Sequence, residues 1–188
     1  MGMDIYGKNP TLVGVKPELD FSIASDEAKK EFFDQLNDWE EKNPGYYFRA
    51  NIWSWRPIQM IIEFVNQKKD LQLNTNGFGE NGGHGLESQE ECDKLADAIS
   101  EFMAGSELND EEDTLYLCLG MWVKEDRNFG VPNEITEDLN EQFEFGRIIQ
   151  GGVVAKDGNV YYPAWGTSKW HLEEFVNFLR NCGGFEIW

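Results

Sequence analysis

The stretch Tyr46–Arg56, YYFRANIWSWR, decides how we interpret the fold. A strand turns successive side chains to opposite faces, and this stretch alternates along its whole length. Read as a strand, it has one apolar face that anchors it to a core, formed by Tyr46, Phe48, Ala50 and Ile52. Its other face carries Tyr47, Arg49, Asn51, Trp53 and Trp55, with Arg56 at the end. Pro57 then suits the first turn of a helix.

Apolar side chains at helical spacing predict helices on both sides of this stretch. Ser88 followed by Glu91 is typical of a capping box, in which each residue satisfies a backbone N–H of the other at a helix start. The predicted helices cover residues 26–42, a segment after Pro57, a segment from Ser88 to about Gly105, residues 133–143 and about 168–181.

Further strands are predicted at residues 3–6, 71–73, 148–155 and 160–162, with 185–188 as a tail or an edge strand. The Asp157-Gly158 pair favours a hairpin turn. Leu115–Val123 favours a central strand, although the preceding acids also suit a helix N-terminus. Because strands and helices do not alternate regularly, we predict an α+β fold. It forms one domain over residues 1–188, with about four to five helices packed on a small mixed or antiparallel sheet.

The chain is strongly acidic, with 16 Lys and Arg against 35 Asp and Glu and a net charge of -19. Nucleic-acid binding depends on cations that displace counterions from phosphate, and anionic membranes also attract basic segments. We therefore expect neither nucleic acid nor a membrane as a partner. The acids indicate a solvated surface, a surface that docks basic partners, or a decoy for a nucleic-acid-binding protein.

Cys92, Cys118 and Cys182 are odd in number and widely spaced, without a CxxC pair. This pattern indicates reduced, structurally incidental thiols and neither a metal site nor a cofactor. We find no signal-peptide pattern and no apolar run near the roughly 18 residues of a membrane span. The expected location is the cytoplasm.

The glycine-rich segment Asn76–Gly85, NGFGENGGHG, does not match a phosphate-binding loop, because the Walker and dinucleotide patterns are absent. A flexible surface loop is the plainer interpretation. It carries His84, one of two histidines in the chain; the other, His171, lies three residues before Glu174. We find no catalytic constellation, so an enzyme is not favoured.

The aromatic and arginine side chains of the Tyr46–Arg56 stretch are the strongest functional signal. Exposed aromatic rings beside arginine are typical of binding hot spots, although a helix of the same domain would also cover them. The candidate ligand- or partner-binding residues are Tyr47, Arg49, Asn51, Trp53, Trp55, Arg56 and His84; we assign no catalytic or metal-binding residue.

Four segments carry a family resemblance: the opening MGMDIYGKNP, YFRAN and WSWRP within residues 47–57, and the ending FLRNCGGFEI. Over both ends and the first third, the chain resembles a family of uncharacterised small bacteriophage and bacterial proteins. The resemblance implies the cytoplasm of a bacterium or of a phage-infected host, and no known activity. We therefore expect a noncatalytic binding or interaction protein that acts on an unknown small polar ligand or a protein partner. A small enzyme acting on a nucleotide or another polar ligand is the alternative.

Overall fold

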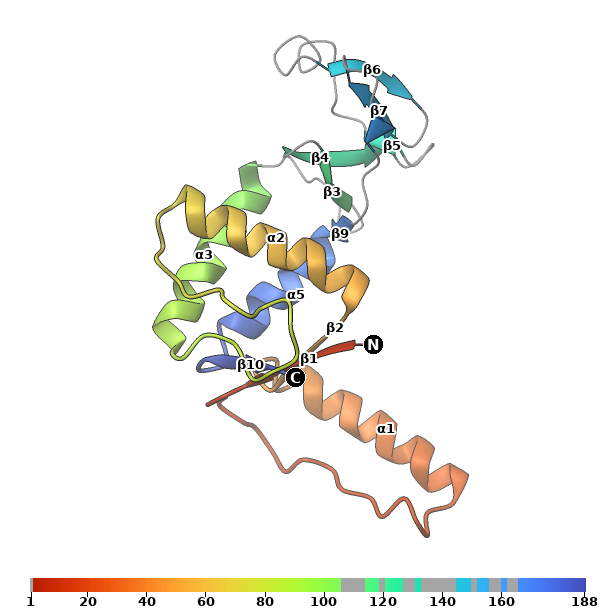
Figure 1. The fold of residues 1–188 in the computed structure, drawn as a ribbon. Coiled ribbons are helices and arrows are strands. Elements are labelled where there is room, and N and C mark those ends of the chain that lie inside the picture. Colours follow the sequence, from red (N-terminus) through yellow and green to blue (C-terminus); the bar gives the residue numbers. More distant parts are fainter. Residues whose placement is uncertain are drawn as a thin grey trace.

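The computed structural model describes the backbone of residues 2–105, 114–118, 121–126, 131–132, 145–149, 152–155, 160–161 and 166–188. It describes the side chains of residues 2–105, 114–115 and 166–188. These residues contain helices α1 (Asp26–Glu41), α2 (Ile52–Lys68), α3 (Gln89–Gly105) and α5 (Lys169–Leu179) (Figure 1). All their strand pairs are antiparallel. The fold is α+β, as predicted. That residues 1–188 form a single domain stays a prediction.

One sheet joins the two ends of the chain. Strand β1 (Gly2–Gly7) lies between β2 (Tyr47–Asn51) and β10 (Phe185–Ile187). Ile5 of β1 stands opposite Phe48 on one side and Ile187 on the other. The strands predicted at both ends are confirmed, and the termini lie near each other (Figure 1).

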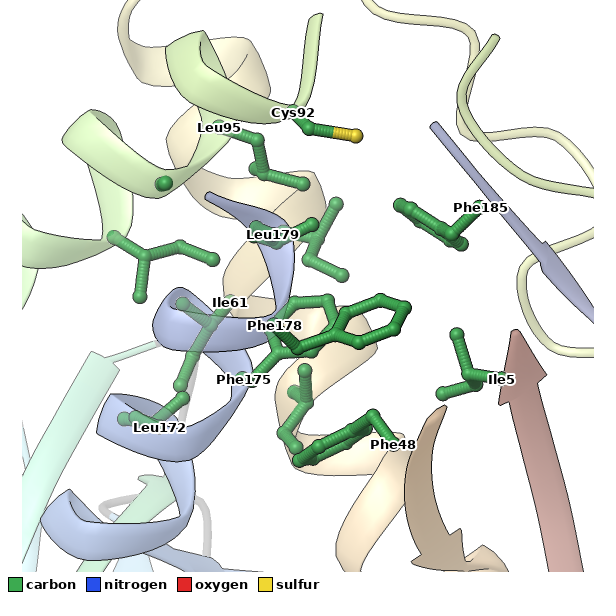
Figure 2. Packing of buried hydrophobic residues seen from close by; sticks show 14 of the residues in the cluster. Ile5, Phe48, Ile61, Cys92, Leu95, Leu172, Phe175, Phe178, Leu179 and Phe185 are labelled. Carbon is green, nitrogen blue, oxygen red and sulfur yellow. The ribbon is translucent and has the colours of Figure 1, made fainter. Parts of the chain in front are cut away.

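Helices α2, α3 and α5 cover the inner face of this sheet with a core of aliphatic side chains and several aromatic rings (Figure 2). The ring of Phe48 on β2 lies 5.1 Å from that of Phe175 on α5, measured between centroids. Phe178 of the same helix lies 6.1 Å from Phe185 of β10. Burying one such ring contributes about 2 kcal/mol. The core therefore fixes α5 against β2, and both elements contribute to the site described below.

The helix ends follow local signals in the sequence. Glu91 Oε2 accepts a hydrogen bond from the Ser88 N–H at 3.1 Å, and Ser88 Oγ accepts one from the Glu91 N–H at 3.3 Å. This is the predicted capping box. Ser168 caps α5 by accepting from the His171 N–H at 3.2 Å. After α5, Gly183 and Gly184 take φ angles of 64° and 94°, a region that favours glycine, and the chain turns back into β10.

The strand predicted at 115–123 is two strands. β3 (Thr114–Cys118) pairs with β4 (Met121–Asp126) on one side and with β9 (Gly166–Ser168) on the other. Glycine favours hairpin turns, and Gly120 lies between the two strands in the sequence. The short strand β5 (Val131–Pro132) pairs with β4.

A third sheet contains β6 (Phe145–Ile149), β7 (Gly152–Ala155) and β8 (Val160–Tyr161). β7 pairs antiparallel with β8, while the turn predicted at Asp157-Gly158 lies outside the described residues. The strand predicted at 148–155 is divided between β6 and β7. The helix predicted at 133–143 lies outside the described residues. No strand forms at 71–73, where the side chain of Asn66 instead hydrogen-bonds the Leu73 carbonyl at 3.0 Å and its N–H at 3.1 Å.

Residues 8–44, which we call the arm, are joined to the core at their two ends and otherwise project away from it (Figure 1). The only buried residue of α1 is Trp39. The extended segment before α1 is tied to the end of the helix by Asn43, whose side chain donates to the Val13 carbonyl at 3.0 Å and to the Trp39 carbonyl at 2.7 Å. Near the start of α1, Phe21 packs edge-on against Phe32 at 5.2 Å. The helix predicted at 26–42 is confirmed, but it packs mainly on its own neighbouring segment.

Candidate binding groove

The strand predicted from Tyr46 to Arg56 ends early, because Asn51 caps a helix. Asn51 Oδ1 accepts hydrogen bonds from the N–H groups of Trp53 at 2.9 Å and Ser54 at 3.0 Å. The chain is therefore helical from Ile52, and Pro57 is the sixth residue of α2. Side chains in a helix rotate by about 100° per residue instead of alternating. The prediction that Tyr47, Arg49, Asn51, Trp53 and Trp55 share one strand face is therefore wrong.

Trp55 belongs to the core. Its exposed fraction is 1%, and its Nε1–H donates to the Phe78 carbonyl at 2.6 Å. Its ring meets Phe175 edge-on at 5.7 Å. Trp53, by contrast, is 66% exposed at the start of α2, and Arg56 is exposed on the same helix. The structure therefore separates Trp55 from the other candidate residues.

His84 lies on the glycine-rich segment, which packs against the C-terminal strand. The N–H of Ile187 donates to the His84 carbonyl at 2.9 Å, and the N–H of Gly83 donates to the Ile187 carbonyl at 2.8 Å. Phe78 of the same segment is fully buried. The segment is thus partly built into the core, in contrast to the surface loop that the sequence indicated.

Tyr47 and Arg49, on the outer side of β2, line a groove of about 660 Å³. The groove lies between β2, the end of α1 and the middle of α5. Tyr47 and Arg49 are the only two of the predicted binding residues that line it. The remaining lining residues are Asn37, Glu40, Glu41, Pro44, Phe48, Glu174, Asn177 and Phe178.

The groove is acidic, because three glutamates face one arginine. Partial burial raises the pKa of Glu40, and the nearby Lys16 opposes that rise. Partial desolvation also raises the pKa of Glu174, although much of this residue stays exposed. A carboxylate in such surroundings is stabilised by a cation brought close to it. The groove is therefore electrostatically suited to a positively charged ligand.

Tyr47 forms a fixed wall of the groove. Its hydroxyl donates a hydrogen bond of 2.5 Å to Asp4 on β1, and its ring lies 5.1 Å from that of Tyr6. Burial, followed by the hydrogen bond to Asp4, raises the pKa of the Tyr47 phenol. The residue stays neutral at physiological pH and offers an apolar ring surface beside the carboxylates.

His171 supports the groove from behind and is not among its lining residues. Its ring stacks on that of Phe48 at 5.2 Å. Burial lowers the pKa of His171, while a hydrogen bond to the backbone of Arg49 opposes this change. The imidazole is thus held in the neutral form and helps to fix β2 against α5.

The glutamates of the groove were not predicted as binding residues from the sequence, although two of them, Glu40 and Glu41, carry a recognisable signal. Glu40 and Glu41 end α1, whose last turn has no basic residue. Carboxylates at this position oppose the helix dipole, even with Lys42 following at the C-cap. Glu174 and Asn177 carry no comparable signal, because they reach the groove only through the packing of α5 on β2.

The part of the chain that the structure describes contains neither a candidate metal site nor a helix that could span a membrane. No three His, Cys, Asp or Glu side chains there are grouped to hold a metal ion. No helix among the same residues is long and apolar enough to cross a membrane.

No family model, curated protein or solved structure matches this chain. The family resemblance of its two ends therefore stays a hypothesis.

Proposed function

We propose that this chain is a noncatalytic interaction protein that holds a basic, apolar segment of a protein partner on its arm and in the groove at the base of the arm. The observation that carries this proposal is the distribution of exposed apolar side chains. Ten large hydrophobic side chains are exposed in the described part of the chain, and six of them lie on the arm. These six are Leu12, Val13, Val15, Phe21, Ile23 and Phe33.

Apolar side chains are unfavourable in contact with water, and a partner that covers them removes this cost. Exposed apolar patches therefore mark interaction sites. Val15 is 90% exposed and Ile23 is 83% exposed. The arm also carries nine carboxylates and five lysines. A partner that matches this surface needs apolar side chains to cover the arm and positive charge to complement its acids.

The groove continues this surface toward the core, since Asn37, Glu40 and Glu41 belong to both. It offers apolar walls from Tyr47 and Phe48 and carboxylates from two sides. Neither His84 nor His171 lines it, which favours binding over a catalytic role for this site. Arg49 is the single cation among the residues that line the groove. Its charge repels partners that carry more positive charge than the glutamates of the groove can balance.

Replacing two groove carboxylates, Glu40→Gln and Glu174→Gln together, is expected to weaken binding of a basic peptide about tenfold. Two partly desolvated charge pairs of about 0.7 kcal/mol each give this factor. The probe is a fluorescein-labelled lysine–leucine peptide, followed by fluorescence polarisation. Because burial raises the pKa of both groups above 4.5, wild-type affinity should fall as the pH drops through this raised range. The double variant should lack most of that dependence.

The matched control is Glu63→Gln with Glu80→Gln, which removes the same charge from exposed positions outside the groove. This control should lower affinity less than twofold. Arg49→Ala should act in the opposite direction and strengthen binding. A lysine–serine peptide and a glutamate–leucine peptide should both bind weakly. Equal losses in the two double variants would mean that only the overall charge attracts the peptide, and would refute the proposal.

A further inference from the structure

Two cysteines that are far apart in the sequence are neighbours in the core. The Sγ atoms of Cys92 and Cys182 lie 3.6 Å apart, although the residues are separated by 90 positions. Both are free thiols and both are fully buried. Cys92 lies in the first turn of α3, at the edge of the core (Figure 2), and Cys182 lies between α5 and β10. The wide spacing of Cys92 and Cys182 in the sequence suggested incidental thiols, but the fold brings them together as a pair.

Hydrogen bonds hold the turn that carries Cys182 against the start of α3 and against the segment after β1. The Gln89 side chain accepts a hydrogen bond from the Gly183 N–H at 2.7 Å and donates one to the Leu179 carbonyl at 2.9 Å. On the other side, the Asn9 N–H donates to the Cys182 carbonyl at 3.0 Å. A disulfide needs a sulfur–sulfur distance of about 2 Å, so the sulfurs must approach by about 1.6 Å. A bridge therefore requires the two cysteine side chains to rotate toward each other.

The surroundings make the two thiols unequal. The contact with the Cys92 sulfur, together with the amides of Gly184 and of Cys182 itself, lowers the pKa of the Cys182 thiol against the opposing effect of burial. The hydrogen bond to Cys182 and burial raise the pKa of Cys92. The exposed residues Arg180 and Asn181 directly precede Cys182 in the chain, so Cys182 is the sulfur that an oxidant reaches first, and Cys92, 3.6 Å away, resolves the intermediate.

We propose that Cys92 and Cys182 form a redox-modification site, which a hydroperoxide converts into a reversible disulfide between α3 and the turn before β10. The Cys182 thiolate attacks one peroxide oxygen, the O–O bond breaks, and the released hydroxide takes up a proton to give water and a sulfenic acid. The Cys92 sulfur then attacks the Cys182 sulfur, the S–O bond breaks, and the hydroxide leaves as water with the Cys92 proton. Two thiols lose two electrons and two protons, and one hydrogen peroxide becomes two waters.

Hydrogen peroxide is small enough to reach the pair through local opening of the exposed turn around Arg180 and Asn181. The resulting bond closes a loop of 90 residues and ties the C-terminal strand to the start of α3. Closing so long a loop raises the melting temperature by about 10 °C in the chain-entropy description. Oxidation therefore locks the sheet formed by the two chain ends onto the helices.

The test is to treat the folded wild-type chain with hydrogen peroxide, map its peptides by nonreducing mass spectrometry and measure thermal melts. The expected product is a peptide pair joined through Cys92 and Cys182, lighter by two hydrogen atoms, with a higher melting temperature that dithiothreitol reverses. Cys118→Ala should leave the bridge and the shift intact, whereas Cys92→Ala should abolish both. A bridge through Cys118, oxygen adducts without a bridge, or thiols that stay unmodified would each overturn the proposal.

Discussion

Replacing Trp55 by alanine is expected to lower the free energy of unfolding by about 4 kcal/mol. Truncating a large aromatic side chain in a core costs about 3–5 kcal/mol through lost burial and the cavity left behind. Trp55 is fully enclosed, and its loss also leaves the Phe78 carbonyl without the Nε1–H donor at 2.6 Å. Urea denaturation, followed by far-UV circular dichroism, measures the change.

Trp53→Ala is the matched control, because the same side chain is removed two residues away from a position that is 66% exposed. Its expected cost is less than about 1 kcal/mol. Trp55→Phe should fall between the two, since it keeps most of the ring but loses the hydrogen bond. Similar losses for Trp53→Ala and Trp55→Ala would contradict the assignment of these residues to a helix that begins at Ile52.

Gly85→Ala is expected to lower the free energy of unfolding by about 3 kcal/mol through overpacking. A Cβ atom on Gly85 would overlap the Phe185 carbonyl group and come within 3.0 Å of the Glu186 Cα. Both are backbone atoms of β10, which is held on one side by β1 and on the other by the His84–Ile187 bridge. The strand cannot move aside without breaking hydrogen bonds.

Gly105→Ala provides the control for the change from glycine to alanine itself. A Cβ atom there meets no heavy atom within 4 Å, and alanine is the better helix former by up to about 1 kcal/mol. This variant should be as stable as the wild type or slightly more stable in the same urea titration. If Gly85→Ala also left stability unchanged, the glycine-rich segment would not be packed against β10.

The elements that follow local chemistry could be predicted from the sequence. The capping box of Ser88 and Glu91, the apolar stripe of α2 and the antiparallel pair of β7 and β8 depend on residues a few positions apart. The α+β class follows from these elements and their order. Such signals act within one or two turns, so they can be recognised without knowledge of the tertiary structure.

The strand–helix junction at Asn51 was predicted wrongly, because two patterns overlap there. The alternation of side chains continues to Arg56, while Asn51 and the residues after it also suit a helix cap. Packing decides in favour of the helix, since Trp55 then reaches Phe175 and Phe78 in the core. Tyr47 and Arg49, on the strand side of the junction, keep the outward position that alternation predicts.

The groove and the cysteine pair could not be predicted, because each depends on tertiary contacts. Glu40 and Glu174 meet only when α5 packs on β2 beside the end of α1. Cys92 and Cys182 meet only when the turn after α5 reaches the start of α3. The spacing of these residues along the sequence does not indicate that the members of either pair lie close together in space.

The most direct test of the proposed binding surface is to titrate the isotope-labelled protein with the lysine–leucine peptide and to follow its amide resonances by NMR. Chemical shifts should change for residues 12–33 of the arm and for Tyr47, Arg49 and Asn177 of the groove. Amides around Glu63 and Glu80 should stay unchanged. Shifts spread evenly over the acidic surface, or the absence of any change on the arm, would contradict the account.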